Sequence, residues 1–590
     1  MTFPAPRSTR DQAWLSIAFA VVLVAHVFFV TRNWESGWLF GHEFRQTQTA
    51  ISAFFIKAED NYSLAYPTPV LGKPWSAPME FPLYQWSVAA LSTRTGWSLT
   101  ACARAISAIC FYATLPAIFL LLGRLGLPPP RRLFVLALLL TTPIYIFYSR
   151  AFLIEAMALA FSAWFLAAFV EMEQRRSWRW LLVAILAGVG AALVKITTFM
   201  VWIIPGAVYG AVLCWQQWRS GEHRRLRATL AWGLGSVLPS IVAALWWIRV
   251  SDRIKGLNPA GANLQADKMV IYNFGPLSVR FDPSTWQKLF HNWHGAVLPL
   301  WAAGLCLVLA WFCPRTYRRP ALWAAAVFFA AQLVFPVLYS IHDYYFYAAA
   351  AFLAVAAGLV LAGLLDSALP RPVIWFAALA LFAGNAEHYW SNYYAWQKIP
   401  SVGGTGLSDA LRNTSPPDSV LVIIGDDWDP ATPYYAQRRA LMIGRYLEHN
   451  WSYLEPALNS LRGEDVFALV AKGDQRGNRE FIDRAIKLFQ LDPQVTFTYG
   501  DTTDVYVRRW HRNRVLRHMG TNEAPYYDKV RMSGTPDAPE GAQQVDAIER
   551  FVHDNDRKTY FAAMSPAPVR YNFLFGLSRF EQDGHQLLGA

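Results

Sequence analysis

The 590-residue sequence is poor in charge and in cysteine. Only 16% of its residues are charged, while 54% are hydrophobic, and soluble domains usually carry about a quarter charged residues. The five cysteines all lie in or beside apolar runs, and the long polar C-terminal part has none. This excludes a disulfide framework and a paired-cysteine metal site. The sequence also lacks a Walker-type loop and a dinucleotide fingerprint, so nothing in it argues for nucleotide use.

In place of charge, the sequence has recurrent long apolar runs. Many approach about 18 residues, the length needed to cross roughly 30 Å of hydrocarbon. The net charge is +12, and the basic residues fall in short loops between these runs, such as 124–132, 175–179, 219–227 and 315–319. That spacing is the positive-inside pattern of membrane topology. We therefore predict an α-helical polytopic membrane protein that contacts membrane lipids, and we expect no nucleic-acid partner.

The alternation of basic loops predicts about eleven transmembrane helices with a cytoplasmic N-terminus. No small-residue cleavage site follows the first run, so we expect a retained helix rather than a signal peptide. The spans end near residue 388, which gives a transmembrane domain at 1–388. The polar remainder, 389–590, is predicted to be an extracytoplasmic α/β domain, because "SVLVIIGDDWDP" and "EDVFALVAKGD" each have a strand-then-turn pattern. "REFIDRAIKLFQ" has the apolar spacing of a helix.

Ionisable residues gather at the predicted outer turns. Such residues are costly near hydrocarbon and are functional candidates by default. The candidates are His42, Glu43 and Arg45 in "GHEFRQTQTA", Glu80 in "SAPMEFPLYQ", Arg150 and Glu155 in "YSRAFLIEAMALAF", Lys195 in "AALVKITTF", and His342, Asp343 and Tyr345 in "SIHDYYFY".

Structural roles are open alternatives for most of these residues. Arg150 and Lys195 have stems long enough to snorkel to outer headgroups. The pair at 342–343 is also suited to capping the start of a helix. A surface ion pair between Glu43 and Arg45 would contribute very little.

Basic groups beside carboxylates at the outer leaflet suit transfer from a lipid-phosphate sugar. Arginine or lysine would hold the phosphate, with a divalent cation such as Mg or Mn between phosphate and carboxylate as a further option. Glu43 would deprotonate an acceptor hydroxyl. The main alternative is a transporter or flippase of lipid-linked glycans, which predicts ionisable residues deep in several spans and on the inner side as well. A non-catalytic scaffold is a third hypothesis, and the buried acids argue against it.

These motifs resemble those of the GT-C superfamily of integral-membrane glycosyltransferases, which includes protein O-mannosyltransferases and the aminoarabinose transferases of lipid A. The resemblance covers about residues 10–390, and within it the first outer loop resembles that of family-39-like bacterial members. "HEFR" resembles the acidic motif of the first outer loop, with His42 where an aspartate is usual. "YSRAFLIEAMAL" resembles the second acidic motif, "LVKITTF" a donor-phosphate motif, and "HDYYFY" a late outer-loop motif.

The resemblance implies a GT-C-like fold and inverting transfer of a hexosyl or pentosyl group from a polyprenyl-phosphate donor. The acceptor would be lipid A, a lipid-linked glycan or a protein on the periplasmic side of a bacterial inner membrane. The implied roles are catalytic for Glu43 and His42, substrate-binding for Arg45, Glu80, Arg150, Lys195, His342 and Tyr345, and metal-binding for Glu155 and Asp343.

Overall fold

The computed structural model describes residues 9–398, 406–500 and 502–519. The chain forms two compact units, each built from segments that are far apart in the sequence. The helical unit consists of Met1–Trp34, Ala101–Arg249 and Met269–Ile399, and the α/β unit of Glu35–Thr100, Val250–Lys268 and Pro400–Ala590. The first predicted outer loop thus belongs to the same unit as the C-terminal region. The predicted topological boundary at residue 388 stays a prediction.

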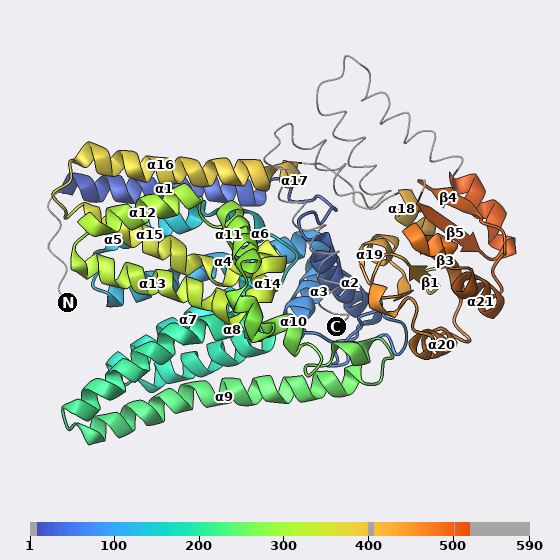
Figure 1. The fold of residues 1–590 in the computed structure, drawn as a ribbon, viewed down its shortest axis with the longest axis horizontal. Helices are drawn as coiled ribbons and strands as arrows, with labels where there is room; N and C mark the ends of the chain where they lie inside the picture. The colour runs from blue at the N-terminus through green and yellow to red at the C-terminus, as the bar shows by residue number, and fades with distance from the viewer. Residues whose placement is uncertain (1–8, 399–405, 501, 520–590) are drawn as a thin grey trace, which may run out of the picture. The chain divides into compact units, whose positions relative to one another are not determined.

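The helical unit is built from long helices and several short helical segments (Figure 1). In chain order they are α1 (Thr9–Thr31), α4 (Leu99–Arg124), α5 (Pro129–Thr141), α6 (Pro143–Tyr148), α7 (Glu155–Arg175), α8 (Trp178–Arg219), α9 (His223–Lys255), α10 (Val270–Phe274), α11 (Pro283–Ala296), α12 (Leu300–Phe312), α13 (Arg315–Val334), α14 (Pro336–Ile341), η3 (Asp343–Ala348), α15 (Ala350–Leu364), α16 (Arg371–Asn392) and α17 (Tyr394–Lys398).

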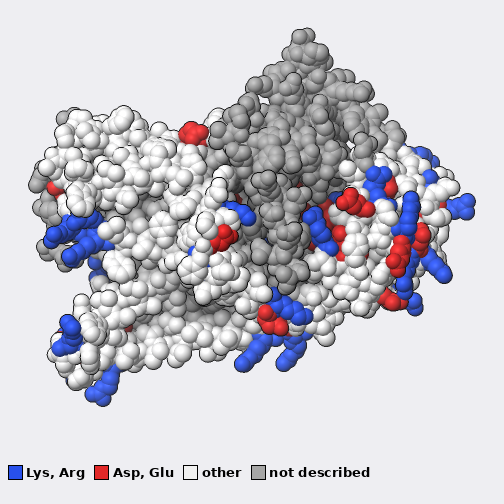
Figure 2. Space-filling model, viewed as in Figure 1, with Lys and Arg blue, Asp and Glu red and all other residues white. Residues whose placement is uncertain are grey.

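Several of these helices have the length and composition of membrane spans. In the described part of the chain, α1, α4, α7, α8 and α9 qualify, and the pair α11 and α12, bent by 89°, makes up to six. Large apolar side chains on them face outward, as at Val24 and Trp311. On the face shown in Figure 2, few charged side chains lie over this unit except near the ends of its helices. The protein is therefore a multi-pass membrane protein, while the count of eleven spans stays a prediction.

One helix break, at Lys195, lies where the sequence predicts an outer turn, and another separates α5 from α6. Lys195 has non-helical backbone angles (φ −159°, ψ 96°) within α8, so α8 consists of two helical segments that meet at a kink where the sequence predicts an outer turn. Pro143 starts α6 directly after the extended residue Thr142, because a residue before proline is disfavoured in helical geometry. These breaks place polar residues inside an otherwise apolar bundle.

The α/β unit contains a five-stranded mixed sheet, as predicted for the C-terminal region. Its strands follow the order β2-β1-β3-β5-β4, with β1 parallel to β2 and β3, and β5 antiparallel to β3 and β4. The elements are α2 (Glu43–Glu59), α3 (Leu83–Thr95), η1 (Gly261–Leu264), α18 (Gly406–Thr414), β1 (Val420–Ile424), α19 (Ala431–Ala436), β2 (Arg439–Met442), η4 (Arg445–Leu447), α20 (Trp451–Ser460), β3 (Val466–Lys472), η5 (Gly473–Gly477), α21 (Arg479–Phe489), β4 (Phe497–Tyr499) and β5 (Thr503–Val507). The irregular tail expected from about residue 522 lies outside the described residues.

A segment of the first outer loop, residues 69–72, extends this sheet beyond β2. The Ala440 amide donates to the Pro69 carbonyl at 2.8 Å, and the Met442 amide donates to the Val70 carbonyl at 2.9 Å. We call this segment the loop strand. Because β2 is an edge strand, these bonds satisfy backbone groups that the sheet alone would leave open. The first outer loop and the α/β domain are consequently one folded body.

Candidate active site

A tight left-handed turn starts helix α2 and orients its first residue, Glu43. Gly41 and His42 both have positive φ, 76° and 53°, a conformation that is uncommon and strained for a residue with a side chain. The side-chain amide of Gln46 reaches the carbonyls of residues 39–41 at 2.7–2.9 Å. His42 makes no side-chain cap for the helix. The catalytic role predicted for His42 stays a prediction.

Glu43 is held by a tyrosine from the sheet domain. The Tyr435 hydroxyl donates to Glu43 Oε1 at 2.7 Å and accepts from the Leu39 amide at 3.2 Å. Burial raises the pKa of Tyr435 well above its usual value, and the adjacent Glu43 charge raises it further. The sequence analysis missed Tyr435, because "PYYAQ" carries no motif and lies 392 residues from Glu43.

Further carboxylates lie beyond the carboxyl end of strand β1 in the same unit. Asp426 forms an ion pair with Lys472 at the end of β3. Asp429 accepts a hydrogen bond from the Ala431 amide at 2.9 Å. Burial raises the pKa of Asp429, with smaller contributions from the charges of Asp426 and Glu43. Crevices at the carboxyl ends of parallel strands are common ligand sites where neighbouring connections diverge, as they do from β1 and β3.

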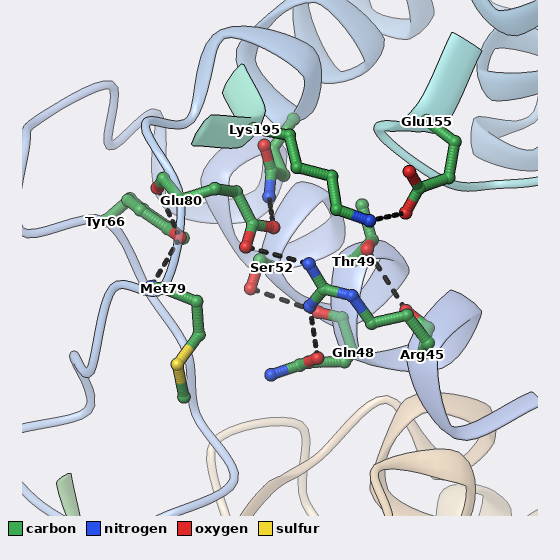
Figure 3. A network of polar contacts seen from close by, with 10 residues as sticks. Arg45, Gln48, Thr49, Ser52, Tyr66, Met79, Glu80, Glu155 and Lys195 are labelled. Atoms are coloured by element: carbon green, nitrogen blue, oxygen red, sulfur yellow. Dashed lines mark hydrogen bonds and ion pairs between the residues drawn. The ribbon is translucent and has the colours of Figure 1, made fainter. Parts of the chain in front are cut away.

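Arg45 and Glu80, two predicted substrate-binding residues, contact each other directly (Figure 3). Arg45 Nη2 lies 2.9 Å from Glu80 Oε2, and Gln85 Nε2 donates to Glu80 Oε1 at 2.8 Å. The Tyr66 hydroxyl donates to the Glu80 main-chain carbonyl at 3.0 Å. The two residues are 35 positions apart, so folding of the loop, not local sequence, creates the pair.

Lys195 and Glu155 form a buried ion pair inside the helical unit (Figure 3). Lys195 Nζ lies 2.5 Å from Glu155 Oε1, with side-chain exposures of 12% and 1%. The ammonium also lies over the rings of Tyr345 and Tyr344, at 4.4 and 5.3 Å from their centroids. Glu155 is the first residue of α7, where the helix dipole favours a carboxylate. The pair thus joins three residues of the sequence prediction, Glu155, Lys195 and Tyr345.

The "HDYYFY" motif comprises His342 and the first five residues of η3. His342 and Asp343 lie in different surroundings. The His342 ring stacks on Tyr344 with centroids 5.3 Å apart, and its side chain makes no cap hydrogen bond at the start of η3. Asp343 is buried, and its two oxygens accept the hydroxyls of Tyr148 at 3.0 Å and Tyr393 at 2.6 Å. Two phenols therefore satisfy this carboxylate within the helical unit.

Arg150 binds main-chain carbonyls at the end of α1. It donates to the carbonyls of Arg32 and, at 2.9 Å, Asn33, and its residue exposure is 5%. Arg104, which the sequence analysis missed, donates to the Asn33 carbonyl at 3.2 Å. The C-terminal end of a helix carries partial negative charge, which suits the two guanidinium groups. Phosphate binding by Arg150 stays a prediction.

The predicted metal ligands do not lie in an evident metal site. Within residues 9–398, 406–500 and 502–519, no group of three or more His, Cys, Asp or Glu residues could hold a metal ion. Glu155 contacts an ammonium and Asp343 contacts two phenols, whereas Mg²⁺ requires near-octahedral oxygen ligands. These surroundings do not fit a divalent cation, and the metal-binding roles of Glu155 and Asp343 stay untested predictions.

The overall fold is similar to that of a solved membrane glycosyltransferase. ArnT from Cupriavidus metallidurans bound to undecaprenyl phosphate matches with a TM-score of 0.54 and 16% identity, covering 84% of this chain and 98% of that one. The apo form of the same protein matches with a TM-score of 0.52 and 15% identity, over the same shares of 84% and 98%. At these identities the likeness establishes the fold alone, which is ArnT-like.

One stretch of the sequence matches a known protein family. Residues 75–245 match the family described as dolichyl-phosphate-mannose-protein mannosyltransferase. That stretch contains Glu80, Arg150, Glu155 and Lys195, and no curated protein matches the sequence. The match of this stretch to a mannosyltransferase family whose donor is a lipid-phosphate-linked sugar, together with the ArnT-like fold, confirms the resemblance seen in the sequence.

Proposed function

We propose that this protein is an inverting glycosyltransferase that moves a sugar from a polyprenyl-phosphate donor to a hydroxyl of an extracytoplasmic acceptor. The acceptor is lipid A, a lipid-linked glycan or a protein. The enzyme lies in a bacterial inner membrane with about eleven spans, a cytoplasmic N-terminus and a periplasmic C-terminal domain. A solved ArnT binds undecaprenyl phosphate, which supports a donor of this chemistry.

The buried pair of Lys195 and Glu155 is the observation that carries the proposal. An ionisable pair within apolar helices is costly and marks functional sites, and this one lies at the break in α8. A phosphate would compete with Glu155 for the ammonium, since both are oxygen anions that form charge-assisted hydrogen bonds with it. Lys195 is thus the primary proposed phosphate contact, with Arg45 and Arg150 as the others.

Glu43 is the proposed general base, with His42 beside it. Its carboxylate takes the proton of the acceptor hydroxyl as the hydroxyl oxygen attacks the anomeric carbon. Attack from the face opposite the phosphate forms the new glycosidic bond and inverts the configuration. The bond from the anomeric carbon to the phosphate oxygen breaks, and polyprenyl phosphate leaves with that electron pair.

The test is transfer from radiolabelled polyprenyl-phosphate mannose in the presence of the native membrane fraction, followed as release of polyprenyl phosphate. Glu43→Gln should lower the rate by about 10²–10⁴-fold, the usual contribution of a general base, while donor binding is retained. Glu455→Gln is the matched control, because Glu455 forms an exposed pair with Arg484. Full activity of Glu43→Gln at normal expression would remove Glu43 from the role of base.

One observation agrees with the alternative function of a flippase. At the end of α7 opposite to Glu155, Glu171 is buried and pairs with Arg124 and Arg175, so ionisable residues are not confined to one end of the helix. A flippase would move the lipid-phosphate sugar across vesicle bilayers without cleaving it. Movement of intact donor by the purified protein, without release of polyprenyl phosphate, would favour that function over transfer.

A further inference from the structure

The residues around Glu43 indicate a role for the α/β domain in the reaction. We propose that Tyr435, on helix α19, is a positioning residue that orients the Glu43 carboxylate for proton abstraction. This inference rests on the proposed role of Glu43 as the base. It makes the C-terminal domain part of the catalytic machinery, although the sequence motifs all lie in the N-terminal two thirds of the chain.

The first argument for this role is the direction of the two hydrogen bonds made by the Tyr435 hydroxyl. The Leu39 amide donates to the Tyr435 hydroxyl oxygen at 3.2 Å. With its oxygen engaged as an acceptor, the phenol directs its single proton to Glu43 Oε1, 2.7 Å away. The bond therefore fixes one carboxylate oxygen and the plane of the group.

Packing contacts hold Tyr435 in place, as is required of a residue that positions another. Its ring is buried and meets the Trp38 ring edge-on, with centroids 5.5 Å apart. Phe44, next to Glu43, makes a similar contact with Trp428 at 4.8 Å. The loop strand at 69–72 binds β2, which follows α19. Glu43 and Tyr435 thus belong to one folded body, which is the condition for precise orientation.

The chemical consequence follows from what a hydrogen bond does to a carboxylate. A donated bond favours the charged form, so it lowers the pKa of the group, and it removes rotational freedom before the reaction. Loss of the hydroxyl should lower kcat while the KM for the lipid donor stays unchanged. The acidic limb of the kcat profile should move to higher pH, because the base then loses its proton later.

The experiment compares Tyr435→Phe with Tyr453→Phe in the full-length protein, using polyprenyl-phosphate mannose as donor and the native membrane fraction. Tyr453 is matched: it lies buried in α20 of the same domain, and its hydroxyl has no hydrogen-bond partner among the described residues. We expect kcat of Tyr435→Phe to fall by about 10–100-fold, as for small losses of orientation, and Tyr453→Phe to match the wild type. An unchanged kcat and pH profile in Tyr435→Phe would overturn the proposal.

A double variant separates positioning from a folding effect. If Tyr435 acts through Glu43, adding Tyr435→Phe to Glu43→Gln should lower the residual rate no further. A further full loss in the double variant would show that Tyr435 acts by another route and would refute the inference. The outcomes also separate this proposal from the proposed function: a fully active Glu43→Gln removes the base itself, whereas an inactive Glu43→Gln with a fully active Tyr435→Phe removes only the positioning role.

Discussion

Replacing Lys195 by methionine should destabilise the protein strongly, because it leaves the Glu155 carboxylate buried without its cation. The two charges lie 2.5 Å apart, which corresponds to about 7 kcal/mol of attraction at an effective dielectric constant of about 20. Desolvation offsets part of this, and removal of one partner from a buried pair costs about 3–5 kcal/mol. Methionine keeps the length of the side chain and a favourable sulfur contact with the Tyr345 ring, so packing changes little.

The assay is thermal unfolding in detergent of Lys195→Met, Glu155→Gln and the double variant. The double variant should be more stable than Lys195→Met, since a neutral amide replaces the stranded charge. Losses that simply add would refute the coupling. Undecaprenyl phosphate should raise the Tm of the wild type by binding the folded state. Equal protection of the double variant would show that Lys195 does not contact the phosphate.

Two further predictions concern other buried charges. Arg131 forms a two-bond ion pair with Asp366, with side-chain exposures of 5% and 3%, so Arg131→Leu should cost about 3–5 kcal/mol of stability and Arg131→Leu with Asp366→Leu considerably less. Unfolding in detergent checks this, and equal losses in the two variants would contradict it. Burial raises the pKa of Glu448 to about 7. Its contribution to stability is full below its unfolded pKa and is lost as pH rises towards 7, so the Tm of wild type minus that of Glu448→Gln should decrease over that window; a constant difference would contradict the assignment.

The membrane class and the sheet could be predicted because their signals are local. A span needs only a continuous apolar run, whose length is set by the bilayer. The run "VLVII" before an acidic turn is sufficient to indicate a buried strand, and it forms β1. Lys195 was expected at a turn between two helices, and it lies at the kink where the two helical segments of α8 meet.

The partners of the site residues could not be predicted, because tertiary packing chooses them. Nothing near Glu43 in the sequence indicates Tyr435, and nothing near Arg45 singles out Glu80 among the acids of the outer loop. Arg104 lies in a helix with an apolar sequence pattern, yet it binds the carbonyls of Asn33 and Trp34, which follow α1. The proline-rich stretch that forms the loop strand has no alternation of a strand, and it pairs because the edge of β2 offers open backbone groups.

The loop strand also determines how this protein can be divided for experiment. A fragment cut at the polar boundary near residue 400 would keep the five strands but lose residues 69–72, leaving the outer edge of β2 bare. A bare edge is a template for pairing with a second molecule, so such a fragment should self-associate on expression. A fragment meant to stay monomeric has to carry residues 35–100 fused to the sheet, which makes the domain discontinuous in the gene.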